Sequence, residues 1–145
     1  MTYKVKFRAW DKSTKKYWNV ENWHFEGECL DLIEQGGNIA DGDTKHIWRK
    51  VSDVVVEQYT GTEDANGKPI YANDFISFDW YEHGDYGLVE WNKNEGRFEV
   101  HFGTVNANER DLEYKVEETM PWEEYYDGKP TVVGNCHENP ELWGR

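Results

Sequence analysis

The stretch from Gln58 to Ile76 constrains the fold of this chain most strongly, because it places glycine-containing turns between short strand-forming runs. Its Asn66-Gly67 pair is the favoured dipeptide of tight hairpin turns, which need positive φ angles. Pro69 then limits where ladder hydrogen bonds can form, since proline has no N–H group. Together with GLVEW at 87–91, the stretch predicts a strand, a turn, a second strand and a further strand.

Alternating apolar residues extend this β pattern to both sides of the stretch. Residues 5–9 and 98–102 place apolar side chains at every second position, which is typical of a half-buried strand. Short strands separated by turns, at a spacing of roughly 8–12 residues, are typical of sandwiches and small barrels. We therefore predict an all-β, mostly antiparallel protein. It would consist of an N-terminal β-hairpin unit (residues 1–57) and a C-terminal SH3-like small barrel (residues 58–145).

The composition favours a folded domain over a disordered chain. Only 37% of the 145 residues are hydrophobic and the mean hydropathy is −0.97, but 16% are aromatic. Disordered chains are poor in aromatic residues. Aromatic rings bury large areas and tolerate the half-exposed surface of a small sheet.

Three segments are harder to interpret. Residues 29–34 (CLDLIE) fit either a strand or a short helical turn. Residues 106–126 show no readable pattern, although residues 121–125 are compatible with one helical turn. Residues 139–142 (NPEL) predict a terminal turn, because the proline follows an asparagine.

Three separated blocks of the sequence carry a family resemblance. These are KFRAWD at 6–11, the turn-rich block at 58–76 and VVGNCHENPELW at 132–143. In this order they resemble the YopX family, small proteins carried by phages and prophages of Gram-positive bacteria. That family has no established biochemical activity. The resemblance therefore implies a fold and a biological context without a mechanism.

Two positions differ from what the resemblance implies. The family has Tyr, any residue, Gly and Asp before the strand at Phe75, whereas this chain has Tyr71-Ala72-Asn73-Asp74. Asn also adopts positive φ angles, so the turn is expected to persist. Cys136 stands where the family has an apolar strand residue, which favours a small buried side chain over a metal ligand.

Charge is distributed unevenly in this chain of net charge −13. Residues 1–20 carry six basic residues against Asp11 alone, whereas residues 61–145 carry 7 basic and 19 acidic residues. Such an acidic body repels phosphate, which disfavours generic nucleic-acid binding. We favour a basic hairpin that balances its own acidic body. An acidic surface offered to a basic partner, or one that mimics nucleic acid, stays open.

No catalytic, metal or cofactor motif is recognisable. The cysteines and histidines lack the short paired spacing of zinc sites. Asp41 and Asp64 begin calcium-like loops, but the twelfth positions are Ser52 and Phe75 instead of glutamate. Nucleophile-elbow and phosphate-loop patterns are absent from the sequence. We therefore expect a protein that is not an enzyme and needs no metal or cofactor.

Two groups of residues are candidates for a functional surface. The first is a signature loop formed by Thr60, Gly61, Asn73 and Asp74. These residues either bind a partner or have a purely architectural role. The second is a basic and aromatic face of the N-terminal hairpin, formed by Lys6, Arg8, Trp10, Lys15 and Lys16. Rings beside basic residues can stack on single-stranded nucleic acid. We favour core positions for the rings and solvent positions for the lysines.

Three functions are compatible with these features. The favoured one is a non-enzymatic phage or prophage accessory protein that binds protein partners or itself. The alternatives are an acidic mimic that inhibits a host DNA-binding enzyme, and a nucleic-acid binder that uses the basic hairpin. Exposed strand edges and surplus aromatic residues also predict a homo-oligomer, most simply a two-fold dimer.

The expected location is the bacterial cytoplasm. No apolar run approaches the ~20 residues that span a bilayer, and the N-terminus lacks the apolar stretch of a signal peptide. Cys29 and Cys136 lie far apart in the sequence. They are expected to be free thiols in a reducing compartment.

Overall fold

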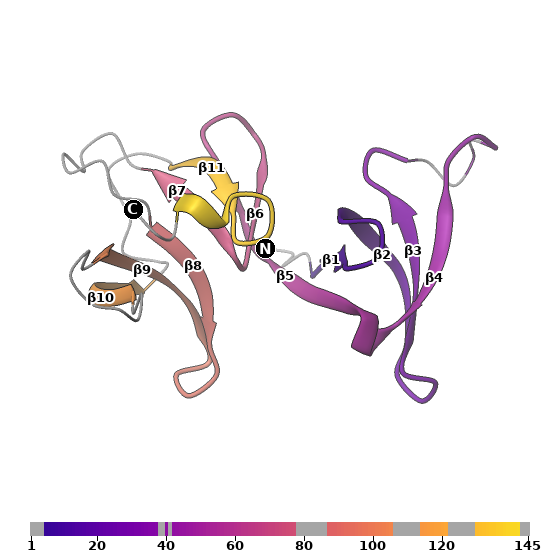
Figure 1. Cartoon of the computed structure of the whole chain (residues 1–145), viewed down its shortest axis with the longest axis horizontal. Helices are drawn as coiled ribbons and strands as arrows, with labels where there is room; N and C mark the ends of the chain where they lie inside the picture. The colour runs from indigo at the N-terminus through magenta and orange to yellow at the C-terminus, as the bar shows by residue number, and fades with distance from the viewer. Residues whose placement is uncertain are drawn as a thin grey trace. The chain divides into compact units, whose positions relative to one another are not determined.

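The computed structural model of the chain describes residues 5–37, 40, 42–77, 87–105, 114–121 and 130–142, and only the backbone of 102–105 and 114–121. The chain divides into two compact units, Met1–Tyr59 (unit 1) and Thr60–Arg145 (unit 2). Each is described by itself, with its strands labelled in Figure 1. The predicted boundary between residues 57 and 58 stays a prediction.

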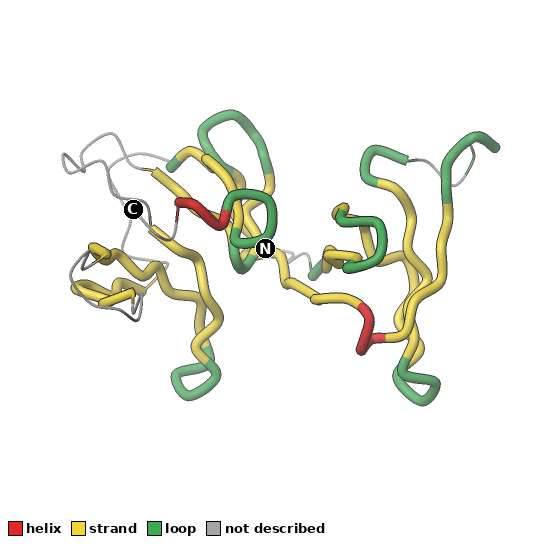
Figure 2. Tube along the Cα trace, viewed as in Figure 1, coloured by secondary structure: helices red, strands yellow, loops and turns green. Residues whose placement is uncertain are grey.

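The described secondary structure is almost entirely β. Every strand pair with a described register is antiparallel. The helical segments of the described part are two short 3-10 turns, η1 (Val51–Asp53) and η3 (Pro140–Leu142), drawn red in Figure 2. The prediction of an all-β, mostly antiparallel protein is confirmed.

Unit 1 is built around the predicted hairpin and is larger than that hairpin. Its strands are β1 (Phe7–Asp11), β2 (Lys16–His24), β3 (Cys29–Glu34), β4 (His46–Lys50) and the first part of β5 (Val54–Glu63). They are ordered β4-β3-β2-β1-β5. The ambiguous segment at 29–34 is therefore a strand, because both of its edges pair with neighbours.

The core of unit 1 lies on one face of this sheet. Ala9 stands opposite Trp18 on β2 and opposite Val56 on β5. Side chains alternate between the two faces of a strand. Ala9 and Trp18 therefore pack with Leu30, Leu32 and Val54 in a buried cluster, while Arg8 and Trp10 lie on the other face.

Unit 2 contains a second antiparallel sheet. Its strands are β6 (Pro69–Tyr71), β7 (Asp74–Ser77), β8 (Gly87–Asn92), β9 (Arg97–Val105), β10 (Tyr114–Pro121) and β11 (Thr131–Asn135). The five-stranded sheet has the order β10-β9-β8-β7-β11, and β6 pairs with the last part of β5. The buried cluster of this unit consists of Ile70, Ile76, Val89, Phe98 and Val100.

Several local predictions can be compared with these elements. The tight turn at Asn66-Gly67 is present, with a φ of 80° at Gly67. Residues 114–121 form strand β10 in a segment without a readable sequence pattern, and Pro121 is the last residue of this strand. Phe78, residues 83–85 and residues 122–125 lie outside the described residues.

Candidate interaction surface

The signature-loop residues of unit 2 stabilise two turns of the backbone. The Thr60 hydroxyl donates a hydrogen bond of 2.8 Å to the Ile70 carbonyl, across the β5–β6 hairpin. Gly61 has a φ of 89°, which few residues with a side chain adopt. These contacts explain Thr60 and Gly61 as parts of the hairpin architecture.

Asn73 and Asp74 hold the next turn, between β6 and β7. Asn73 has a φ of 71°, as expected for an asparagine in a glycine position. Its N–H donates to Val89 on β8 at 2.8 Å, and its carbonyl accepts from the Cys136 N–H at 3.0 Å. The buried Asp74 carboxylate accepts the Tyr71 N–H at 2.9 Å. The two residues therefore connect three segments of unit 2.

Asp64 is an architectural residue that sequence reasoning treated only as part of a turn. One carboxylate oxygen accepts the N–H groups of Asn66 and Lys68, both at 2.8 Å. The other accepts the Val132 N–H of β11 at 3.1 Å. Burial alone would raise the pKa of Asp64, but the three N–H donors and the Lys68 charge lower it below its ordinary value. The Asp-x-Asn-Gly pattern was the available signal, although it does not reveal the bond to β11.

The predicted basic and aromatic face is not one open surface. Arg8 is only 5% exposed and its Nε lies 2.9 Å from the Glu57 carboxylate. The Lys6 ammonium lies 4.4 Å from the centroid of the Tyr59 ring. Lys15 is in the turn after β1, and Lys16 stands opposite Asp11, on the face that Trp10 does not share. Arg8 is therefore committed to an internal ion pair.

Asp11 anchors strand β4 to the hairpin of unit 1. Its buried carboxylate accepts hydrogen bonds from the backbone N–H and hydroxyl of Thr14. It also accepts Nε of Arg49 at 3.0 Å and Nη2 at 3.3 Å. Burial alone would raise the pKa of Asp11, but the bonds from Thr14 and Arg49 and the Arg49 charge lower it. The contact fixes Arg49, and with it the end of β4.

Trp48, next to Arg49 on β4, is the most accessible tryptophan of the described part. The residue is 54% exposed. It borders three open hollows of unit 1, which we call together the Trp48 surface. The largest, the aromatic hollow, has a volume of about 720 Å³ and is lined by Trp23, Phe25, Gly27, Glu28, Trp48, Lys50, Val51 and Ser52.

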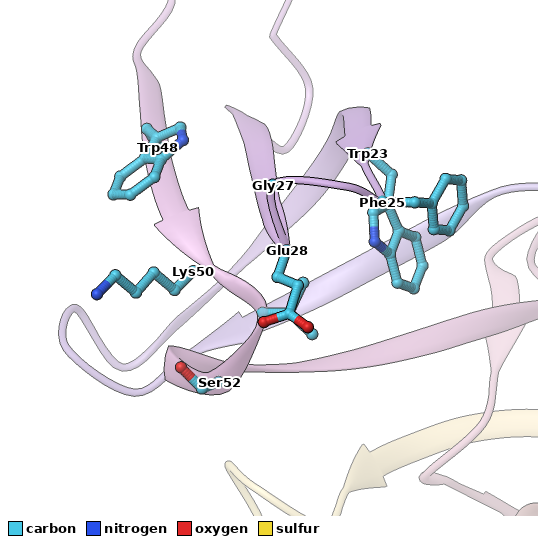
Figure 3. Close-up of a pocket in the computed structure, with 8 residues that line it drawn as sticks. Trp23, Phe25, Gly27, Glu28, Trp48, Lys50 and Ser52 are labelled. Atoms are coloured by element: carbon cyan, nitrogen blue, oxygen red, sulfur yellow. The ribbon is translucent and has the colours of Figure 1, made fainter.

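The aromatic hollow is bordered by Trp23 and Phe25 on one side and by strand β4 on the other. Figure 3 shows Trp23 and Phe25 on one side, Trp48 and Lys50 on the other, and the Glu28 carboxylate between them. The rings of Trp23 and Phe25 are stacked with centroids 5.0 Å apart, and Phe25 is 75% exposed. Exposed aromatic side chains that lie close together are typical of surfaces used for binding.

The other two hollows differ in charge. The basic hollow, of about 590 Å³, is lined by Lys12, Ser13, Trp48, Arg49, Lys50 and Asp53. The acidic hollow, of about 400 Å³, is lined by Glu21, Asn22, Asp31, His46, Ile47 and Trp48. Imidazole nitrogens already contact its carboxylates, with His46 3.1 Å from Glu21 and His24 2.8 Å from Asp31. Trp48 thus lies between the basic hollow, at the Lys50 end of β4, and the acidic hollow, at the His46 end.

Unit 2 contains a buried carboxylate that is also fully engaged. Glu99 accepts hydrogen bonds from Asn92 at 2.9 Å and Arg97 at 3.1 Å, and His101 lies 3.2 Å away. Burial alone would raise the pKa of Glu99, but these three partners and the Arg97 charge lower it. A carboxylate stabilised in its ionised form is a weak base, so the cluster does not have the character of a general base.

The described residues contain neither a metal-binding cluster nor a membrane-spanning helix. Within them, no group of three or more His, Cys, Asp or Glu side chains is arranged to hold a metal ion. Cys29 and Cys136 are not joined in a disulfide, and both are partly buried. Across the described ranges, no helix has the length and apolar character needed to cross a bilayer.

An all-β chain with an open aromatic surface is the class that these features define. The chain belongs to the YopX family, whose sequence model, described as "YopX protein", matches residues 6–143. The resemblance stated above is thereby confirmed. The crystal structure of protein EF1440 from Enterococcus faecalis is similar, with 24% identity and a TM-score of 0.57. The match covers 98% of this chain and 99% of that one, and supports the fold alone. No curated protein matches the chain.

Proposed function

We propose that this YopX-family protein is a non-enzymatic interaction module of a phage or prophage, which binds a protein partner in the bacterial cytoplasm through the Trp48 surface. The observation that carries the proposal is the exposure of Trp48 and Phe25 around the aromatic hollow. Aromatic side chains are enriched among the residues that dominate the binding energy of protein interfaces. The phage context comes from the resemblance to the family.

The remaining polar groups support a binding role over a catalytic one. Among the described residues, the carboxylates of Asp11, Asp64 and Glu99 have a lowered pKa, and each is held by several donors of the chain itself. Catalytic acids and bases usually have a pKa moved toward the working pH. Here the movement goes the other way, as expected for carboxylates with a structural role.

The proposal is tested by comparing three immobilised full-length proteins: the wild type, Trp48→Ala and Trp91→Ala. Trp91 is the matched control, because it is 48% exposed but lies in unit 2. A lysate of a Gram-positive host is passed over each, and retained proteins are quantified by mass spectrometry. A partner should be retained by wild type and Trp91→Ala and reduced at least about tenfold on Trp48→Ala.

Two results would contradict the proposal. One is a specific partner that Trp48→Ala retains as well as the wild type does. The other is a lysate from which the wild type retains nothing beyond what a blank matrix retains. Melting curves of the three proteins show beforehand that each variant is folded.

A further inference from the structure

Strand β4 forms one edge of the sheet in unit 1, with β3 as its neighbour. The Val51 N–H donates to the Glu28 carbonyl at 2.9 Å, and the Glu34 N–H donates to the Lys45 carbonyl at 3.0 Å. Hydrogen-bonded pairs alternate with non-bonded pairs along an antiparallel ladder. Between these two contacts, the inward backbone groups of β4 are therefore those of Ile47 and Arg49.

The outward backbone groups of β4 belong to His46, Trp48 and Lys50. Among the described residues, the N–H groups of these three have no acceptor. The Trp48 carbonyl accepts a hydrogen bond of 2.9 Å from Nη1 of Arg49. The edge thus offers three donors at every second residue, which is the pattern that an added strand uses.

The side chains beside this edge select the chemistry of an added strand. The aromatic hollow, which Trp48 borders at the edge of β4, has room for an apolar or aromatic side chain. The basic hollow is lined by three cationic residues, Lys12, Arg49 and Lys50, and by one acidic residue, Asp53. The Arg49 charge is balanced by the buried Asp11, and the Lys12 ammonium donates a hydrogen bond of 3.3 Å to the Ser52 carbonyl. The Lys50 end of β4 therefore favours acidic side chains.

We propose that the edge of β4 binds an extended, acidic segment of a partner protein as an additional strand. An apolar side chain of the segment occupies the aromatic hollow, and an acidic side chain lies against Lys12 and Lys50. The proposal rests on the proposed function, since both use Trp48, and it adds the backbone mode and the charge of the partner.

Two other occupants fit these observations less well. A second copy of β4 would place the cationic sequence Lys45-His46-Ile47-Trp48-Arg49-Lys50 against itself, and like charges across a strand pair are destabilising. A single-stranded nucleic acid could stack on Trp48, but it would bring a phosphate with every nucleotide to a chain of net charge −13. It also lacks the alternating backbone groups that pair with a strand edge. Charged edges also discourage indiscriminate strand pairing, which agrees with a selective partner.

The test is a selection from an mRNA-displayed library of random nine-residue peptides against the full-length protein. We expect the selected peptides to be enriched in Asp and Glu and to carry one apolar residue at a fixed position. The charge-reversed variant Lys50→Glu should lower their affinity at least about tenfold. Lys93→Glu, a charge reversal at an exposed lysine of unit 2, is the matched control and should leave it unchanged.

The backbone mode is tested on one selected peptide. N-methylation of those alternate amides that face β4 should abolish binding, whereas methylation of the intervening amides should be tolerated. By NMR, the amide hydrogens of His46, Trp48 and Lys50 should exchange more slowly with solvent in the complex. Unaltered exchange rates at all three amide hydrogens would contradict binding by strand addition.

The remaining outcomes distinguish the two proposals. Peptides without acidic enrichment, or none selected at all, overturn the acidic-strand inference. Tighter binding of oligo-dT than of any peptide, or a dimer that Lys50→Glu dissociates, overturns it in favour of the other occupants. If a lysate partner depends on Trp48 but is indifferent to Lys50→Glu, the interaction module stands and this inference fails.

Discussion

The Asp64 turn of unit 2 and the Trp48 surface of unit 1 contrast in how their groups are used. Asp64 is 2% exposed, and the chain itself supplies its three N–H donors. Trp48 is half exposed, and its outward N–H group has no described acceptor. Satisfied buried groups stabilise a fold, whereas accessible unused groups are available to a partner. The contrast predicts that mutations at the two regions will separate stability from binding.

The largest expected effect is that of Asp64→Ala. The substitution removes a buried acceptor and leaves the N–H groups of Asn66, Lys68 and Val132 without it. We expect the free energy of unfolding to fall by about 3 kcal/mol, measured by urea denaturation. Asp53→Ala, at an exposed carboxylate, is the control and should change it by less than about 0.5 kcal/mol. If both substitutions lowered the free energy of unfolding equally, the structural role of Asp64 would be contradicted.

Low pH should lower the free energy of unfolding through the same residue, Asp64. The pKa of Asp64 is lowered in the folded protein from its ordinary value of 3.8. A lowered folded pKa contributes stability above the unfolded pKa, and this contribution is lost as the pH falls through the folded pKa. Unfolding free energies should therefore decrease as the pH is lowered from neutrality to below about 4. Asp64→Asn should make that decrease shallower; an unchanged slope would show that other carboxylates dominate.

Gly134→Ala should have an intermediate effect. A Cβ at Gly134 would lie 2.6 Å from Oδ1 of Asn139, which also accepts the Asn135 N–H in the terminal turn. We expect a loss of about 2 kcal/mol in urea denaturation, because the turn must shift. Gly42→Ala is the matched control, since a Cβ there meets nothing within 4 Å. A tolerated Gly134→Ala would indicate that Asn139 can rotate away freely.

The smallest expected effect on stability is that of Trp48→Ala. Its indole has no ring contact with another described residue. The free energy of unfolding should therefore change by no more than about 0.5 kcal/mol, while partner binding is lost. A loss comparable to that of Asp64→Ala would mean that Trp48 belongs to the core of unit 1, and the contrast between the regions would fail.

The parts of the fold that could be predicted are those governed by local rules. Alternation at 98–102 placed Phe98 and Val100 in the core, and the Asn66-Gly67 pair marked a real turn. Strand β10 escaped prediction because the register shifts between Val116 and Glu118. Such a bulge breaks the period of two on which strand prediction depends.

The candidate site was harder to predict than the fold, because it joins residues that are distant in sequence. Arg8 looked like part of an open basic face, but its partner Glu57 lies 49 positions away. The Trp48 surface combines the end of β2, the edge strand β4 and the 3-10 turn η1. No local pattern indicates that these segments meet.

The sequence by itself determined the β class, the positions of the main turns and the membership of the YopX family, because strand alternation and turn residues act over a few positions. Only the tertiary structure decided which polar groups are satisfied. Sheet pairing brought Val132 to Asp64, Glu57 to Arg8 and Arg49 to Asp11, and it left Trp48 on an open edge. Whether a charge is buried, paired or available depends on which strands become neighbours, and that depends on contacts across the whole unit.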